Sequence, residues 1–218
     1  SEYNWSIIIA DNGSTDGTAD VAQSLVKELP NVGYLRLEQR GRGRALKESW
    51  LSADGDILAY MDVDLSTELN TLTSLMKAIN EDGYDIAVGS RLIEGATVVG
   101  RPVIREIISR AYNLIIKFMF WNKFRDAQCG FKAISRSVAK DVIPLVKDSG
   151  WFFDTELLIL AEKNGYRIKE VPVKWIDDPD SRVRITKTAY EDMKGLLRLR
   201  FGGLRKASKL LSGSGRRG

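Results

Sequence analysis

The sequence of 218 residues contains no histidine and a single cysteine, Cys129. The lack of histidine excludes Ser-His-Asp and Cys-His catalytic triads, and it excludes every zinc site that uses histidine. Any bound metal must therefore be held by carboxylates, carbonyl oxygens and water, which favours Mg²⁺ or Mn²⁺ over zinc. A single cysteine cannot form a disulfide within the chain, which suits a reducing compartment.

Long apolar runs are also missing, since none reaches the roughly 18 residues that are needed to span a bilayer. The length and the apolar fraction of 44% suit one globular domain with a sizeable core. We therefore expect one main domain over residues 1–185.

Positive charge is concentrated at the C-terminal end. Residues 186–218 carry nine Lys or Arg against two acids, so the rest of the chain must be acidic for the net charge to be +4. This pattern predicts basic amphipathic helices that associate with an anionic membrane surface, on the cytoplasmic face of a membrane. A solvated tail is the plainer alternative. Nothing in the basic pattern indicates nucleic acid as a partner.

Short apolar runs alternate with helical patterns in the first two thirds of the chain. The expected strands cover residues 6–10, 32–37, 57–61 and 86–88, and the expected helices cover 18–29, 45–53 and 67–80. This order predicts an α/β fold with a mostly parallel, Rossmann-like sheet flanked by helices. A later helix, expected over 105–121, is apolar almost all round in its second half. It fits either a buried core helix or a helix at a membrane interface.

Polar residues follow three of the expected strands, and sites in such sheets lie at the carboxyl ends of strands. Asp11 and Asn12 follow the first strand in a glycine-containing turn, which could bind a ribose or a base, or simply begin a helix. Asp62 and Asp64 follow the third strand. Two carboxylates in this place can hold one hard cation against phosphates, although two solvated loop acids would give the same pattern. Arg91 follows the fourth strand.

Other cations lie outside these strand ends. Arg42 belongs to a run of alternating Arg and Gly that could lie along phosphates, but the run matches neither a dinucleotide fingerprint nor a P-loop. Taken singly, Arg91, Lys132 and Arg182 would be surface charges. Taken together, they could bind two phosphate groups, one on each of two substrates.

Seven segments together resemble one family. In chain order they cover residues 10–18, 42–46, 61–66, 88–91, 125–132, 151–158 and 173–175. They resemble the inverting glycosyltransferases of family 2, which have the GT-A fold, and within that family the synthases of polyprenyl-phosphate (dolichyl-phosphate) glucose and mannose. Gln-Cys-Gly-Phe-Lys at 128–132 and Phe-Asp-Thr-Glu-Leu-Leu at 153–158 lean toward the glucosyl branch.

The resemblance implies inverting, metal-dependent transfer of a hexose from UDP-glucose or GDP-mannose to a polyprenyl phosphate, with Mg²⁺ or Mn²⁺ as cofactor. It implies a role for each candidate residue. The donor nucleotide would be bound by Asp11, Asn12, Arg42 and Asp62, the metal by Asp62 and Asp64, and the acceptor phosphate by Arg91, Lys132 and Arg182. The catalytic residues would be Asp64, Arg91, Lys132 and Glu156, with Glu156 near the sugar.

Two features depart from the family pattern. The family often has a second acid where this chain has Asn12, and its members usually begin with another strand and helix before Trp5, a strand that forms part of the nucleotide pocket. The missing histidine is no obstacle, because a phosphate monoester has a second pKa of about 6 and needs no strong base to become a nucleophile. The reaction instead needs a stabilised leaving group and cations that bring two anions together.

Two other functions remain open. A phosphatase of the haloacid dehalogenase type would use Asp62 as its nucleophile with Asp64, followed by Ser90 and then by Asp177 and Asp178. That alternative leaves the basic C-terminal helices unexplained. A non-catalytic membrane-binding remnant of the transferase fold is suggested by the absent first strand.

Overall fold

The computed structural model describes residues 3–177 and 185–213 of the chain. The strands are β1 Ile7–Asp11, β2 Val32–Arg36, β3 Ile57–Met61, β4 Ile86–Ser90, β5 Thr97–Val99, β6 Phe131–Ser135, β7 Ile168–Pro172 and β8 Lys174–Ile176. The α-helices are α1 Thr18–Glu28, α2 Arg42–Ser52, α3 Thr71–Asn80, α4 Val103–Phe120, α5 Arg136–Asp141, α6 Phe153–Lys163, α7 Ile185–Arg198 and α8 Leu204–Gly213. A 3₁₀ turn, η1, covers Ile143–Leu145, and a π-helical segment, η2, covers Leu199–Gly203.

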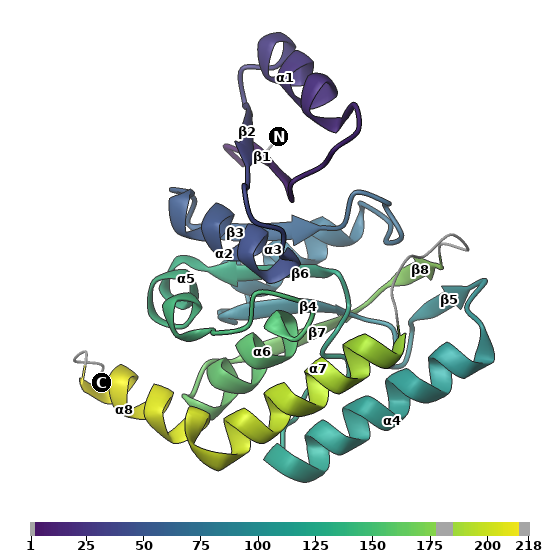
Figure 1. Ribbon diagram of the computed structural model, residues 1–218, viewed down its shortest axis with the longest axis vertical. Helices are drawn as coiled ribbons and strands as arrows, with labels where there is room; N and C mark the ends of the chain where they lie inside the picture. The colour runs from purple at the N-terminus through teal and green to yellow at the C-terminus, as the bar shows by residue number, and fades with distance from the viewer. Residues whose placement is uncertain (1–2, 178–184, 214–218) are drawn as a thin grey trace.

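The central sheet has four strands in the order β3-β6-β4-β7 (Figure 1). Strand β6 runs antiparallel to both of its neighbours, whereas β4 and β7 are parallel. The sheet is therefore mixed rather than mostly parallel, because a strand from the second half of the chain is inserted between β3 and β4. The α/β layering holds: all of β4 is buried, with Ile86 and Val88 in the core formed with α4 and α6, and Ala87 in the core beneath α3.

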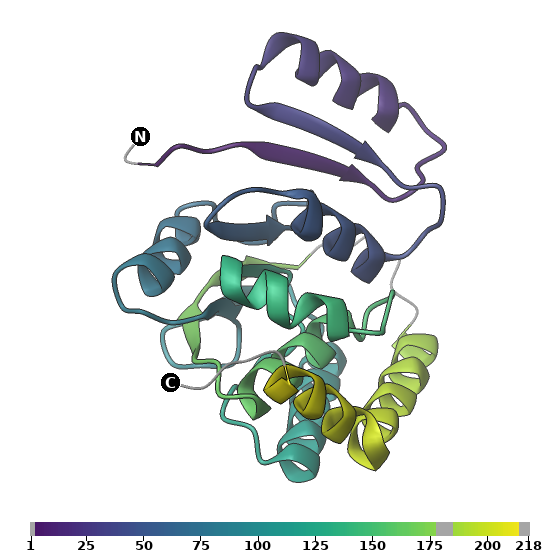
Figure 2. The same ribbon diagram turned by 90° about the vertical axis from the view of Figure 1, so that its left-hand side faces the viewer.

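Strands β1 and β2 form a parallel sheet of their own, with α1 packed beside it. Figures 1 and 2 show this unit at one end of the molecule, beyond β3. Among the described residues, the strands that were expected in one sheet are therefore divided between this unit and the central sheet. The outer edge of β1 has no strand partner among them, and Ile7 and Ile8 are exposed.

The C-terminal helices lie against the main body. Leu196, Leu199 and Ala207 are buried in the same hydrophobic core as α4 and α6. Gly202, with a φ of 138°, breaks the helical geometry and separates α7 from α8. Within the described ranges, no helix is both long and apolar enough to cross a bilayer. The domain boundary at residue 185 stays a prediction.

Candidate functional site

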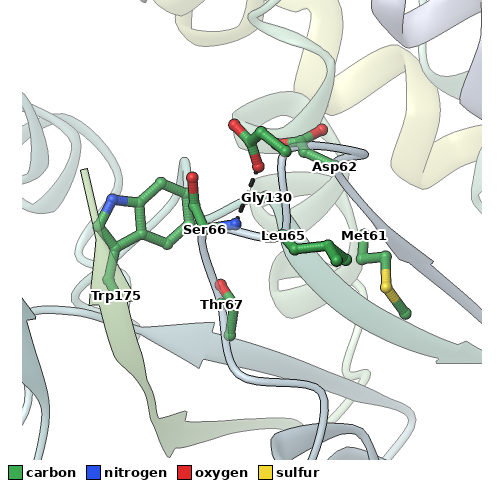
Figure 3. Close-up of a pocket in the computed structure, with 8 residues that line it drawn as sticks. Met61, Asp62, Leu65, Ser66, Thr67, Gly130 and Trp175 are labelled. Carbon is green, nitrogen blue, oxygen red and sulfur yellow. Dashed lines mark hydrogen bonds between the residues drawn. The ribbon is translucent and has the colours of Figure 1, made fainter. Parts of the chain in front are cut away.

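A pocket lies where β3 ends. It encloses about 180 Å³, counting the part that is open to solvent. The pocket is lined by Met61, Asp62, Asp64, Leu65, Ser66, Thr67, Gly130 and Trp175. Figure 3 shows Trp175, from β8, across the pocket from Asp62. The predicted strand-end carboxylates therefore border a shared cavity.

Asp64 lies exposed at the rim of this pocket. One of its carboxylate oxygens accepts a hydrogen bond from the backbone N–H of Ser66 at 3.0 Å (Figure 3, dashed line). Between them, Leu65 has a φ of 51°, in the left-handed region that leucine seldom adopts. This tight turn fixes the Asp64 carboxylate beside the cavity.

Asp62 is partly buried and is held by a cation. The Nη2 atom of Arg42 lies 3.1 Å from its Oδ1 atom. Burial raises the pKa of Asp62 above its usual value, and Arg42 opposes that rise. A Cβ atom on Gly130 would lie 1.9 Å from the other Asp62 oxygen, so only glycine leaves room for the carboxylate here.

Behind Asp62 lies a buried ion cluster centred on Asp154. Lys132, which is fully buried, places its Nζ atom 2.9 Å from one Asp154 oxygen, and the hydroxyl of Tyr60 donates to the same oxygen at 2.6 Å. Arg42 pairs with the other oxygen, so it bridges Asp154 and Asp62. Burial alone would raise the pKa of Asp154, but Lys132 and Arg42 together lower it. The Lys132 ammonium is thus paired within the protein, and its predicted contact with the acceptor phosphate stays a prediction.

Arg91 does not line the pocket itself but contacts Trp175, which does. Its guanidinium makes two hydrogen bonds to Asp126, at 2.8 and 2.9 Å, and lies 4.8 Å from the centre of the Trp175 ring. Burial alone would raise the pKa of Asp126, but the Arg91 charge lowers it to about 2. Arg91 is thus a fixed cation stacked on Trp175, a residue that lines the pocket.

Glu156 lies away from this pocket, on α6. Its side chain is buried and pairs with Arg198 of α7 at 2.7 Å. It also accepts hydrogen bonds from the backbone N–H groups of Lys147 and Asp148. Glu156 therefore joins α7 to the loop before α6, and its implied role near the sugar stays a prediction.

Asp11 and Asn12 belong to the unit formed by β1 and β2. The Asp11 carboxylate accepts hydrogen bonds from the Ser14 N–H and the Tyr34 hydroxyl, both at 2.7 Å. Hydrogen bonding by the Ser14 side chain and backbone, and then by Tyr34, lowers the pKa of Asp11. The side-chain oxygen of Asn12 accepts from the Gly41 N–H at 2.6 Å, just before α2. Through Asn12 this unit is tied to the helix that carries Arg42.

The structure brings together only part of the predicted set. Four of them lie close together around the end of β3: Arg42, Asp62, Asp64 and Lys132. Arg91 stacks on Trp175, which lines the pocket. Asp11, Asn12 and Glu156 lie elsewhere, and Arg182 lies outside the described residues. Sequence reasoning missed Asp154 and Tyr60, although Asp154 lies within the segment 151–158 that supports the resemblance.

A metal ion would have few protein ligands here. The described residues contain no group of three or more acidic or cysteine side chains that could hold an ion. Two carboxylates, Asp62 and Asp64, suit Mg²⁺ or Mn²⁺ that takes its remaining ligands from substrate phosphates and water. The room that Gly130 leaves for Asp62, and the exposure of Asp64, fit that mode of binding.

Comparison with known proteins points in one direction. A family model described as glycosyl transferase family 2 matches residues 1–143. Glycosyltransferase AglD of Haloferax volcanii is 36% identical over 84% of this chain, and a dolichyl-phosphate beta-glucosyltransferase of Dictyostelium discoideum is 31% identical over 92%. The chain spans only 29% and 64% of the length of these two relatives.

The fold is also similar to solved structures. Glucosyl-3-phosphoglycerate synthase of Mycobacterium tuberculosis, in complex with UDP, aligns with a TM-score of 0.61 at 18% identity, over 93% of this chain and 68% of that one. The same enzyme in complex with Mn²⁺, UDP-glucose and glycerol 3-phosphate aligns with a TM-score of 0.59 at 16% identity. At this identity the likeness establishes the GT-A fold alone.

The phosphatase alternative gains no support. Asp177, one of the two paired acids in that alternative, pairs with Arg105 at 3.0 Å and accepts a hydrogen bond from the indole N–H of Trp175. Asp178 lies outside the described residues. The relatives reported above are named as glycosyltransferases.

Proposed function

Because the chain belongs to glycosyl transferase family 2, we propose that it transfers glucose from UDP-glucose to a polyprenyl phosphate such as dolichyl phosphate. The observation that carries the proposal is the pocket at the end of β3, where two carboxylates stand beside a cluster of fixed cations. The names of relatives favour a glucosyl donor and a dolichyl acceptor. In-line attack by the acceptor phosphate would invert the anomeric carbon.

Asp62 and Asp64 are the residues that would hold Mg²⁺ or Mn²⁺. When bound, the ion would neutralise charge on the departing diphosphate. Arg42 pairs with Asp62 and so holds its carboxylate in place. The Arg42 guanidinium thereby also lies close to the pocket. The buried pair of Lys132 and Asp154 fixes Arg42 from behind, so the cations are arranged before the substrates arrive.

The two substrates would be bound by separate groups of residues. Asp11, Asn12 and Arg42 remain our candidates for the nucleotide, because Asn12 is hydrogen-bonded to the start of the helix that carries Arg42. Arg91 remains a candidate for the acceptor phosphate, and Arg182 is retained from the sequence alone. The acceptor is already an anion at neutral pH, so the protein has to position it rather than deprotonate it.

The direct test is the transfer of labelled glucose from UDP-glucose into a product that is extracted with lipid. We expect label in the lipid fraction only when polyprenyl phosphate and Mn²⁺ are both present. GDP-mannose serves as the competing donor. Lipid-linked mannose without lipid-linked glucose would overturn the choice of donor.

We also propose that the protein lies on the cytoplasmic face of an anionic membrane. Helices α7 and α8 and the segment between them expose six cations: Lys187, Lys194, Arg200, Arg205, Lys206 and Lys209. Apolar side chains are exposed among them, and Phe201 at the break between the helices is 82% exposed. Cations that flank exposed aromatic and aliphatic groups are typical of helices that bind the lipid headgroup region.

Neutralising three of these cations should weaken membrane binding. Each cation near an anionic surface contributes about 1 kcal/mol, so the triple variant Lys194→Gln, Arg200→Gln, Lys206→Gln should bind phosphatidylserine vesicles on the order of a hundredfold more weakly. Sedimentation with vesicles measures the loss, and added salt should abolish the difference.

The matched control neutralises three exposed lysines on other helices: Lys27, Lys77 and Lys140. It should bind vesicles nearly as well as the unaltered protein. Equal losses in both triple variants would show that only net charge matters, and would refute a membrane face on α7 and α8.

A further inference from the structure

Helix α7 is docked on the body of the protein through one face. The buried residues of that face recur at helical spacing: Asp192, Gly195, Leu196 and Leu199. A Cβ atom on Gly195 would overlap the ring of Phe152, which is itself buried, so only glycine lets α7 approach the start of α6 this closely. Asp192 is the acidic member of an otherwise small or apolar contact face.

The Asp192 carboxyl is buried but only partly satisfied. Just 3% of the residue is exposed. Its Oδ2 atom accepts a hydrogen bond from the side-chain amide of Gln128 at 2.8 Å. Its Oδ1 atom is buried and has no hydrogen-bond partner among residues 3–177 and 185–213. Because burial of a charge without full hydrogen bonding is unfavourable, this environment favours the neutral carboxyl over the carboxylate.

Acidic groups on neighbouring elements act on Asp192 in the same direction. Burial is the main cause that raises the pKa of Asp192 to about 7, and the hydrogen bond from Gln128 opposes the rise. Three acids add to it: Asp148 in the loop before α6, Glu191 on α7 and Asp154 on α6. From α4, the Tyr112 hydroxyl interacts with the same carboxyl; burial raises the pKa of Tyr112, and the Asp192 charge adds to that rise. Asp192 therefore changes its charge near neutral pH.

Gln128 connects Asp192 to the pocket. It belongs to the loop at 126–130, which leads into β6. Two residues after Gln128, Gly130 lines the pocket and leaves the room that the Asp62 carboxylate occupies. The Gly130 carbonyl oxygen also accepts a hydrogen bond from the backbone N–H of Asp62 at 3.3 Å. A bond that fixes Gln128 therefore also restrains the loop that contacts Asp62.

We propose that Asp192 is a positioning residue for the donor pocket: its neutral carboxyl fixes the loop at 126–130 through Gln128, and its ionisation loosens both this loop and α7. When the proton is released to water, a negative charge remains in the core among three other acids. Separation of α7 from the loop then lets water solvate that charge. The consequence for donor binding rests on the proposed function, whereas the loop itself can be followed without any substrate.

The test uses Cys129, the only cysteine of the chain, as a reporter of the loop. Cys129 follows Gln128 directly and is fully buried, and burial raises the pKa of its thiol to about 12. A thiol-specific reagent can therefore label it only when the loop opens. The labelling rate is measured between about pH 5 and 8.5 for the unaltered protein and for Asp192→Asn. Dividing the two rates at each pH cancels the pH dependence of the thiol itself.

The unaltered protein should open more readily than Asp192→Asn as the pH rises. Asparagine stays neutral and can still accept the Gln128 hydrogen bond, so it mimics the protonated carboxyl. We expect the ratio of the two rates to rise on the order of tenfold or more and to level off above about pH 7. A decrease of one unit in the Asp192 pKa on opening is sufficient for a factor of ten. Asp192→Ala, which removes the hydrogen bond, should label faster than both proteins at low pH.

The donor gives a readout that fails independently. UDP-glucose with Mn²⁺ should slow the labelling of Cys129 at every pH, because Gly130 in the same loop lines the pocket and binding stabilises the closed loop. A persistent pH-dependent ratio without any slowing by the donor would count against the proposed function and would leave the role of Asp192 supported.

Glu191→Gln is the matched control, since Glu191 is the exposed acid next to Asp192 on α7. Its negative charge raises the Asp192 pKa, so the pH dependence should persist in this variant and level off at a lower pH. Equal rates for the unaltered protein and Asp192→Asn at every pH would overturn the proposal. Faster labelling of Asp192→Asn at high pH would overturn it too, because the charge would then stabilise the docked helix. If Asp192→Ala does not fold, Asp192→Asn, which keeps the size of the side chain, decides alone.

Discussion

We expect the Asp64→Asn substitution to abolish glucose transfer and to remove the Mn²⁺-dependent part of UDP-glucose binding, while the protein still folds normally. The amide keeps the shape of the side chain and can still accept the Ser66 hydrogen bond, but it has lost the negative charge that would hold the ion. Because Asp64 is exposed, the free energy of unfolding should change by no more than about 0.5 kcal/mol. Turnover should fall on the order of a thousandfold or more, as expected when a main source of charge stabilisation is removed.

Two measurements separate this effect from general damage: calorimetric titration of UDP-glucose with and without Mn²⁺, and thermal melting. Asp82→Asn is the control, since Asp82 is also an exposed acid but lies far along the chain from the pocket, after α3. It should behave like the unaltered protein. Near-normal turnover in Asp64→Asn would refute the assignment of the metal site.

Lys132→Met should lower the stability of the whole protein as well as its activity. The substitution removes the cation from a fully buried pair and leaves Asp154 with Arg42 and Tyr60 alone. Breaking such a pair by removing one partner typically costs about 3–5 kcal/mol. For a protein of this size the melting temperature should fall by roughly 6–20 °C. Transfer should be lost even where the variant is folded, because Asp154, which pairs with Arg42, loses one of the two cations that fix its position.

The pH dependence of stability gives a second readout. The folded-state pKa of Asp154 lies below its unfolded value, so its contribution is complete above the unfolded pKa of about 3.9 and is lost as the pH falls through the folded value. Without Lys132 that contribution should shrink, so Lys132→Met should lose less stability on acidification than the unaltered protein. Arg136→Met removes a more exposed cation, paired with Asp54, and serves as the control. Equal melting temperatures for the two variants would contradict the role given to the buried pair.

Local patterns predicted the elements well and their pairing less well. The apolar runs of β1, β3 and β4 lie within a residue or two of the expected bounds, because each is short and ends at a polar residue. The helix expected from residue 67 begins at Thr71 instead, since Thr67 forms a β-bridge with Trp175. The insertion of β6 between β3 and β4 depends on pairings between residues that are 44 to 78 positions apart along the chain, which periodicity does not report.

The long helix is buried on one side and exposed on the other, and whether its exposed side contacts a membrane stays a prediction. Its apolar second half fitted either a buried helix or an interfacial one. In α4, Ile116 and Phe120 are buried in the core, whereas Leu114 and Phe118 are exposed. A helix that is apolar all round carries no sequence signal for which side faces the core, so only packing decides.

The sequence predicted the carboxylates of the candidate site, but it did not predict the buried ion pairs that support them. Asp62, Asp64 and Arg42 meet as expected, because they lie at or near the ends of elements that converge. Lys132 and Glu156 were expected to face ligands, yet both are buried in ion pairs. Their partners, Asp154 and Arg198, lie 22 and 42 residues further along the chain. Local sequence patterns do not predict pairings over such distances.

The measurement that tests the central claim most directly is the anomeric configuration of glucose in the lipid product. Purified protein on phosphatidylserine vesicles would receive UDP-glucose, polyprenyl phosphate and Mn²⁺, and NMR of the extracted product would report the linkage. We predict β-linked glucose on the lipid phosphate, formed by in-line attack on the α-linked donor. An α-linked product, or release of phosphate from a simple phosphoester without any sugar nucleotide, would contradict the account.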